Sequence, residues 1–182
     1  MSYRYEIRLS GEGGQGLVLA GKILAEAAAI YDDKNATQSQ SYGPEARGGA
    51  SRSEVIISDE DIDYPKAIHI DFLLALTQEA CNRYSKDLKE GAILLVDSDS
   101  VKECPQGKYK IYKVPIIDTA RSKIGRAVVA NIVSLGIIVE LTKIVSIEAI
   151  ESAILARVPK GTEKINLEAF KAGTEIGKEL MA

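Results

Sequence analysis

The sequence predicts an α/β fold with a mainly parallel sheet and helices on both faces. Segments of strand length alternate along the chain with segments that have apolar residues at helical spacing. Residues 72–77 and 92–96 are continuous apolar runs, typical of strands buried on both faces of a parallel sheet. A glycine-rich turn at residues 11–16 joins a first strand to a first helix, as in nucleotide-binding units. We therefore expect a single Rossmann-like domain over residues 1–182, with a helical C-terminal part.

The N-terminal part of the chain supplies strands around one helix. Alternating apolar positions predict a strand over residues 3–10. Apolar residues then recur at helical spacing from Leu17, and the first helix is expected at residues 20–30. A weak strand at 35–40 follows, and residues 50–58 predict a strand that returns into the core.

The remaining elements are two further strands and several helices. Gly91 is expected to close a helix at 78–88, ahead of the apolar strand 92–96. A late strand is predicted at 109–115. Residues 126–141 are apolar nearly all round, so this helix must be buried in the core or against another subunit. Other expected helices are a short one at 118–124, one at 147–157 capped by Ser146, and a last one at 163–180.

The composition argues against several classes of protein. The chain has 182 residues, 46% of them hydrophobic, which suits one domain with a substantial core. With 23 basic against 26 acidic residues, its net charge of −3 gives no electrostatic case for nucleic-acid binding. The longest apolar run, residues 127–139, is shorter than the roughly 20 residues that span a bilayer. We expect a soluble, cytoplasmic protein that binds neither nucleic acid nor membrane.

The residue types that most often carry chemistry are scarce. Cys81 and Cys104 are too few and too far apart for an iron–sulfur cluster or a Cys-only zinc site. They are expected to be buried or idle thiols. The single histidine, His69, precedes an apolar strand and is more typical of a packed or capping residue than of a base. We therefore expect no catalytic residue and no metal site in this chain.

The stretch Gly11-Glu12-Gly13-Gly14-Gln15-Gly16 matches the dinucleotide-binding spacing G-x-G-x-x-G. Such a turn directs backbone N–H groups at a phosphate near the start of a helix, although it can also serve only for close packing. An NAD(P) site needs an acid at the end of the second strand. Asp32 and Asp33 precede strand 35–40, which ends without a carboxylate. An NAD(P)-binding oxidoreductase is therefore the weaker alternative.

A second unusual stretch is Ser41-Tyr42-Gly43-Pro44-Glu45-Ala46-Arg47-Gly48-Gly49. Gly-Pro and Gly-Gly bracket a loop that displays Glu45 and Arg47, which favours a ligand or interface loop over a merely solvated connection. In open α/β sheets the carboxyl ends of the strands face the ligand crevice. The glycine turn and residues 77–78 and 97–98 should therefore lie along one edge, which is the candidate site.

Two further segments are Val55-Ile56-Ile57-Ser58 and Val129-Ala130-Asn131-Ile132-Val133-Ser134-Leu135-Gly136. Together with the two motifs above, they resemble the gamma subunit of the 2-oxoacid:ferredoxin oxidoreductases over essentially the whole chain. The loop at 41–49 is most similar to that of 2-oxoglutarate-type gamma subunits. Pyruvate-type and branched-chain 2-oxoacid-type gamma subunits are the alternatives. Ala46 and residues 38–40 depart from the bulkier residues of many relatives, so no side-chain contacts are assigned to them.

The resemblance implies a subunit of an enzyme that oxidatively decarboxylates a 2-oxoacid, transfers the acyl group to coenzyme A and passes electrons to ferredoxin. Thiamine diphosphate, magnesium and iron–sulfur clusters would reside on alpha, beta and ferredoxin-like delta partners, and the isolated chain would be inactive. This chain would pack against those partners and help to place coenzyme A, or act only as a scaffold. The expected cofactor-binding residues are Gly13, Gly14, Gln15, Gly16, Tyr42, Glu45, Arg47 and Asn131.

Overall fold

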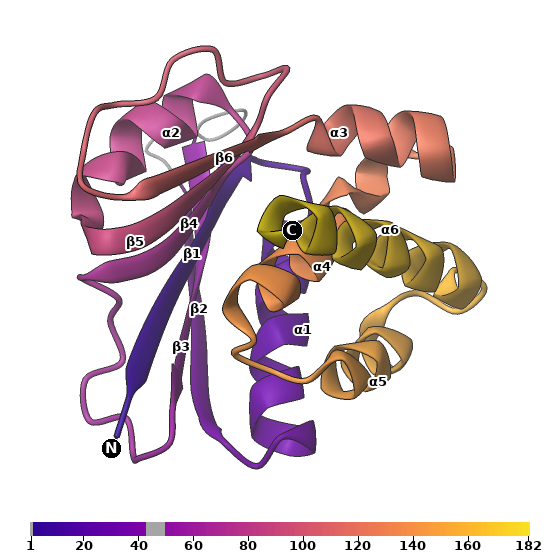
Figure 1. Cartoon of the computed structure of the whole chain (residues 1–182). Coiled ribbons are helices and arrows are strands. Elements are labelled where there is room, and N and C mark those ends of the chain that lie inside the picture. The colour runs from indigo at the N-terminus through magenta and orange to yellow at the C-terminus, as the bar shows by residue number, and fades with distance from the viewer. Residues whose placement is uncertain (1, 43–49) are drawn as a thin grey trace.

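A computed structural model describes residues 2–42 and 50–182. Within these residues the chain forms a six-stranded sheet with the order β2-β3-β1-β4-β5-β6 (Figure 1). The strands are β1 (Arg4–Glu12), β2 (Asn35–Tyr42), β3 (Ala50–Ser58), β4 (Ile70–Ala75), β5 (Leu88–Asp97) and β6 (Lys110–Val114). The α-helices are α1 (Leu17–Glu26), α2 (Gln78–Tyr84), α3 (Ile116–Thr119), α4 (Ala130–Thr142), α5 (Ile147–Arg157) and α6 (Glu163–Met181).

The sheet is mixed, with a parallel part and one reversed strand. Strands β1, β4, β5 and β6 pair in parallel, whereas β3 runs antiparallel to both β1 and β2. The reversal follows from the chain: β2 leads to β3 through the short segment 43–49, and a short connection brings a strand back antiparallel. The expected α/β fold with a mainly parallel sheet is confirmed, with β3 as its reversed strand.

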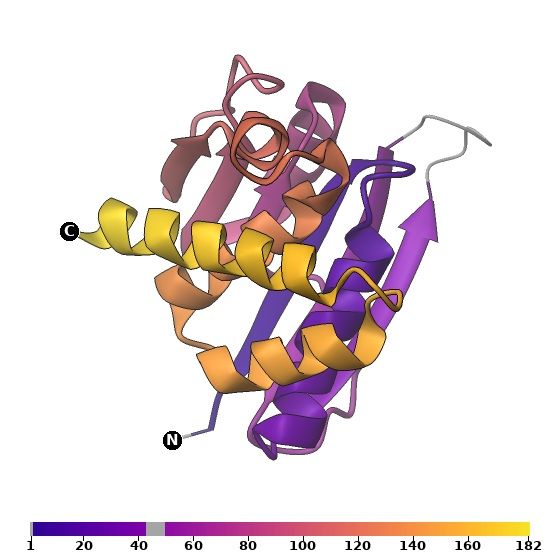
Figure 2. The same ribbon diagram turned by 90° about the vertical axis from the view of Figure 1, so that its right-hand side faces the viewer.

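Helices cover both faces of the sheet, but unequally. Helices α1, α4, α5 and α6 gather on one face, and α2 lies on the other (Figures 1 and 2). The larger core lies under the four helices, where Ile7 and Leu9 of β1 are fully buried. The smaller core joins α2 to the opposite face of β4 and β5. Alternation along β1 sends its other side chains, including Arg8, to this second face.

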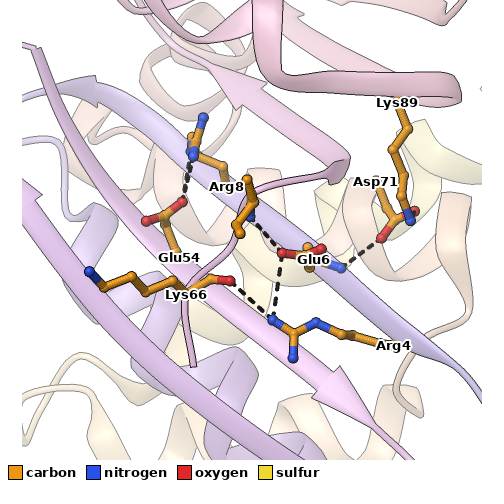
Figure 3. Close-up of polar contacts among 8 residues, drawn as sticks. Arg4, Glu6, Arg8, Glu54, Lys66, Asp71 and Lys89 are labelled. Carbon is orange, nitrogen blue, oxygen red and sulfur yellow. Dashed lines mark hydrogen bonds and ion pairs between the residues drawn. The ribbon is translucent and has the colours of Figure 1, made fainter. Parts of the chain in front are cut away.

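Polar contacts hold the α2 face together along β1 (Figure 3). The buried Arg8 guanidinium forms ion pairs with Glu54 at 2.7 Å and Asp87 at 2.6 Å. The buried Glu6 carboxylate accepts a hydrogen bond of 2.7 Å from the Ile68 backbone N–H. A buried charge is costly unless it is paired, so these partners fix the residues that flank β1 on this face.

Helix α4 is the buried helix predicted from its apolar sequence, and α6 packs closely against it. Two glycines allow the two backbones to approach. A Cβ atom at Gly136 would overlap the Phe170 carbonyl oxygen, and one at Gly173 would overlap the Val133 carbonyl oxygen. Both helices thus depend on the absence of side chains at their crossing.

Two expected boundaries are wrong. Helix α2 ends at Tyr84, with a 3-10 turn after it, and Gly91 lies inside β5 at φ 83°. The register between β4 and β5 shifts between Ile70 and Phe72, and the positive φ of Gly91 accommodates this irregularity, so Gly91 does not close a helix. The helix expected from residue 126 begins at Ala130, because Arg126 has extended backbone and a 3-10 turn follows it.

The replacement Gly173→Ala should destabilise the fold by about 1–3 kcal/mol, because its methyl group would push α6 away from the α4 backbone. Urea unfolding followed by circular dichroism measures the loss. Gly13→Ala is the matched control, since an added Cβ there has nothing within 4 Å. Equal stability of the Gly173 variant and the wild-type chain would contradict this close packing.

Candidate functional site

The carboxyl ends of the parallel strands meet at one edge, as expected. Ser10 pairs with Ala75, which pairs with Val96, so the ends of β1, β4 and β5 are level. The Leu76 N–H donates to the Ser10 carbonyl at 3.0 Å just beyond the paired residues. The glycine turn and residues 77–78 and 97–98 therefore lie along this edge.

Strands β2 and β3 reach the same edge. The end of β2 and the start of β3, which flank residues 43–49, both lie there. Tyr42 pairs with Ser51, and Ser51 pairs with Gly11 at the start of the glycine turn. Ala50, the first residue of β3, pairs with Glu12. The backbone thus leaves β2 and enters β3 next to the glycine turn. Glu45 and Arg47 themselves lie outside the described residues.

Gln15 closes the glycine turn. Its side-chain oxygen accepts a hydrogen bond of 2.8 Å from the Glu12 N–H, and it lies over Gly11, where a Cβ atom would overlap it. Gly14 and Gly16 have φ values of 89° and 73°, a backbone conformation that favours glycine. The shape of the turn therefore accounts for glycine at positions 11, 14 and 16 and for the Gln15 side chain that closes it.

Asn131 ties the glycine turn to the buried helix α4. Its side-chain nitrogen donates to the Gly16 carbonyl oxygen at 2.9 Å, and its side-chain oxygen accepts from the Ile132 N–H at 2.9 Å. The Gly16 carbonyl also accepts the Ala20 N–H of α1 at 3.0 Å. Asn131 is almost completely buried, so its amide acts here as an anchor for the turn.

The outer part of the turn is open. Gly13 and Gly14 are exposed, and a Cβ atom built on either would meet nothing within 4 Å. Helix α1 starts directly behind them, with Gly16 as its N-cap and no side-chain hydrogen bond at that cap. The first N–H groups of a helix lack partners within the helix and carry partial positive charge. This geometry suits the approach of an anionic group to the turn.

Two cavities flank the glycine turn, and Val128 lines both. The larger has a volume of about 270 Å³, and the smaller of about 200 Å³. Their walls come from the turn, from the segment before α4 and from the start of α6. The residues around the larger cavity include Gly16, Leu19, Arg126, Asn131, Thr162 and Asn166, and those around the smaller include Gly14, Gln15, Leu76, Ile117 and Ala127.

Arg126 and Val128 are site residues that the sequence interpretation missed. Both were placed inside a buried helix, whereas the chain before Ala130 is irregular and both side chains are exposed. Arg126 brings a positive charge to the larger cavity, and Val128 is 61% exposed. The available signal was Gly125, whose φ of 95° ends the preceding turn and separates it from α4.

Two acids, one at the carboxyl end of β5 and one shortly before β2, have structural roles. Asp97 is fully buried, and its carboxylate accepts the N–H groups of Ile117 and Ser100, each at 3.1 Å. Asp32 accepts the Ser146 N–H at 2.7 Å and the Ser146 hydroxyl at 2.8 Å, at the start of α5. These contacts anchor α3 to β5 and the start of α5 to the segment before β2.

The position of Asp32 argues against an NAD(P) site. It precedes β2, at the end of the sheet opposite the glycine turn, because Asn35 pairs with Ser58 and Ser58 with Arg4. The carboxyl end of β2 has no acid in its described part, and β3 separates that strand from β1. The geometry that the dinucleotide fingerprint requires at the second strand is therefore missing from these residues.

In residues 2–42 and 50–182, no group of three or more His, Cys, Asp or Glu side chains is arranged to hold a metal ion. Nor does any helix in these residues have the length and apolar character that crossing a membrane requires.

Residues 6–176 match the family model described as pyruvate ferredoxin/flavodoxin oxidoreductase. The chain belongs to this family. It is 56% identical over 179 residues to 2-oxoglutarate synthase subunit KorC of Methanocaldococcus jannaschii, covering 97% of this chain and 96% of that one. This member is also similar to a solved keto/oxoacid ferredoxin oxidoreductase gamma subunit from Geobacter sulfurreducens, with 59% identity and a TM-score of 0.88, over 96% of this chain and 99% of the other.

A more distant family structure shares the fold. The 2-oxoglutarate:ferredoxin oxidoreductase of Magnetococcus marinus, solved with 2-oxoglutarate, coenzyme A and succinyl-CoA bound, has a TM-score of 0.84 at 24% identity. The match covers 97% of this chain but 31% of that one, so the fold here corresponds to one part of a longer polypeptide.

The Asn131→Ala variant should lose about 1–3 kcal/mol of stability, because the Gly16 carbonyl loses one of its two partners and the Ile132 N–H loses the Asn131 side-chain oxygen. Gly16→Ala should also destabilise, since its Cβ would overlap the Asn131 amide. The double variant should be less destabilised than the sum by about 1 kcal/mol, because the overlap disappears. Urea unfolding of all four proteins measures this coupling, and strict additivity would show that the two residues do not act together.

Proposed function

We propose that this chain is the gamma subunit of a 2-oxoglutarate:ferredoxin oxidoreductase, which forms succinyl-CoA from 2-oxoglutarate and coenzyme A and passes electrons to ferredoxin. The observation that carries the proposal is the near-complete, 56% identical match to a 2-oxoglutarate synthase subunit. The 59% identical gamma-subunit structure supports the assignment to the same subunit class. The open edge of the sheet, with its glycine turn, is the surface that we assign to this role.

We assign the redox and decarboxylation chemistry to partner subunits. This chain contains two cysteines, and an iron–sulfur cluster held by cysteine thiolates takes four. The described residues also offer no group of three or more acidic, histidine or cysteine ligands for the metal that accompanies thiamine diphosphate. Neither the cysteine count nor the donor set of the described residues fits these groups, which supports partner subunits as their carriers. We propose that these partners are alpha, beta and ferredoxin-like delta subunits, and that the complex is cytoplasmic with ferredoxin as its electron acceptor.

Coenzyme A fits the edge better, because its phosphates need positive charge and N–H donors. The uncapped start of α1 lies behind the exposed Gly13 and Gly14, and Arg126 lines the cavity beside Gly16. Tyr42 places the start of the 43–49 segment at the same edge. We propose that the glycine turn and Arg126 contact coenzyme A phosphates, with Glu45 and Arg47 as further candidates from the sequence. Coenzyme A supplies the thiol that accepts the acyl group.

The roles of the eight sequence-predicted residues divide within this proposal. Gly13 and Gly14 form the open part of the turn that approaches the ligand. Gln15, Gly16 and Asn131 hold that turn in shape through their hydrogen bonds and thereby position it. Tyr42, Glu45 and Arg47 remain candidates, from the sequence alone, for contacts to coenzyme A or to a partner subunit.

Reconstitution tests the proposed substrate. The chain is co-expressed with its alpha, beta and delta partners, and 2-oxoacid-dependent reduction of ferredoxin is measured with and without coenzyme A. We expect kcat/KM for 2-oxoglutarate to exceed those for pyruvate and 2-oxoisovalerate, and the chain alone to show no turnover. A preference for pyruvate would place the chain with the pyruvate-type subunits, and micromolar NADH binding by the isolated chain would support the dinucleotide alternative.

Arg126→Ala should raise the KM for coenzyme A in the reconstituted enzyme about tenfold, with little change in kcat, because one charge-assisted phosphate contact is lost. Arg121→Ala is a matched control, since this exposed arginine lies 3.9 Å from Asp118 and does not line either cavity. Size-exclusion chromatography checks that both variants assemble. Loss of assembly with an unchanged KM would assign Arg126 to a subunit interface instead.

A further inference from the structure

The two cysteines of the chain come together on the α2 face of the sheet, although they are far apart in the sequence. Cys81 lies on α2 and is fully buried. Cys104 lies in the connection between β5 and β6, is half-buried, and packs against the cluster that contains Cys81. Cys104 lies near enough to contribute to the raised pKa of the Cys81 thiol. The fold therefore brings together two thiols that lie more than 20 residues apart in the chain.

Hydrogen bonds on both sides of Cys104 hold its segment against α2. The Gln78 side chain accepts the N–H groups of Lys102 at 2.8 Å and Glu103 at 3.1 Å, and donates to the Glu103 carbonyl at 2.7 Å. Beyond Cys104, the Tyr109 hydroxyl donates to the Pro105 carbonyl. Residues three apart on a helix lie on neighbouring positions of one face, so the anchor at Gln78 brings Cys104 beside the next turn, where Cys81 lies.

The two thiols differ in access to solvent. Burial, with a smaller contribution from Cys104, raises the pKa of the Cys81 thiol to about 11, so at neutral pH it is almost entirely protonated. Cys104 is half-buried and is the thiol that a small molecule in solution meets first. A cavity of about 440 Å³ opens beside the pair, and its walls include Ser85 and Tyr109. Ser85 lies 3.6 Å from the Cys81 sulfur, so this cavity reaches the immediate surroundings of the pair.

We propose that Cys81 and Cys104 form a reversible dithiol–disulfide pair that responds to peroxides and ties the β5–β6 connection to α2. The Cys104 thiol attacks hydrogen peroxide: a sulfur–oxygen bond forms, the oxygen–oxygen bond breaks, and water leaves. The Cys81 thiol then displaces the hydroxyl of the sulfenic acid: a disulfide forms and a second water leaves. The two thiols lose two electrons and two protons, and the peroxide is reduced to two waters. An external dithiol reverses the reaction.

Oxidation of this pair would act on the edge that carries the candidate site. Helix α2 begins directly after β4 at that edge, where the Thr77 hydroxyl accepts the Ala80 N–H at 3.1 Å. The connection that contains Cys104 leaves β5 at the neighbouring position of the same edge. A disulfide therefore links the segments that follow two adjacent parallel strands, and restricts their relative motion.

The test uses the full chain, treated with hydrogen peroxide and analysed by intact-mass spectrometry. The wild-type protein should lose two hydrogen atoms, remain a single chain on non-reducing gels, and regain its mass with dithiothreitol. Because the chain has two cysteines, a disulfide within one molecule can join only these two. Cys81→Ser should accumulate a Cys104 sulfenic acid that dimedone traps, at least about tenfold faster than any adduct forms on Cys104→Ser.

A structural readout separates this proposal from incidental oxidation. Hydrogen exchange of the backbone amides of residues 102–104 should slow about tenfold in the oxidised wild-type protein and stay unchanged in peroxide-treated Cys81→Ser. Cys81→Ala replaces the serine variant if circular dichroism shows that the latter is unfolded. Irreversible sulfinic or sulfonic acids without a disulfide, disulfides between two chains, or equal dimedone labelling of both single variants would overturn the proposal.

Discussion

The hydrogen bond from the Asn131 side chain to the Gly16 carbonyl is the contact on which the candidate site depends. It joins the glycine turn to helix α4, whose residues from Ala130 to Glu140 are all buried. Glycine gives the turn its positive φ values but contributes no side chain that could hold it in one shape. The amide of Asn131 supplies that constraint from outside the turn, and the rest of the site is built around the turn.

Helix α4 can serve as this anchor because it is itself fixed by close packing. Gly136 and Gly173 allow α4 and α6 to approach closely (Figure 2), so a shift of either helix would cost contacts along the crossing. Before α4, the chain is irregular and exposes Arg126 and Val128 beside the turn. The buried helix thus sets the position of the turn. The exposed segment before the helix provides the charge and the apolar surface next to the turn.

The two ends of the sheet have different roles. At the amino ends of the parallel strands, the Asp32 carboxylate accepts two hydrogen bonds from Ser146 and so fixes the start of α5. At the carboxyl ends, the exposed part of the glycine turn stays open, and cavities remain on both sides of it. This asymmetry leaves one end of the sheet open around the glycine turn, whereas contacts at the other end hold the fold together.

The sequence by itself determined the class of fold, the glycine turn and the buried character of α4, because hydrophobic periodicity and glycine spacing are local properties. Only the tertiary structure decided what depends on residues distant in the chain. The acid near the second strand became a helix anchor, Asn131 became the partner of Gly16, and Cys81 came to lie beside Cys104. Arg126 reached the site because packing, rather than propensity, sets where α4 begins. Such pairings arise when strands and helices separated by many residues pack together, so local sequence patterns do not predict them.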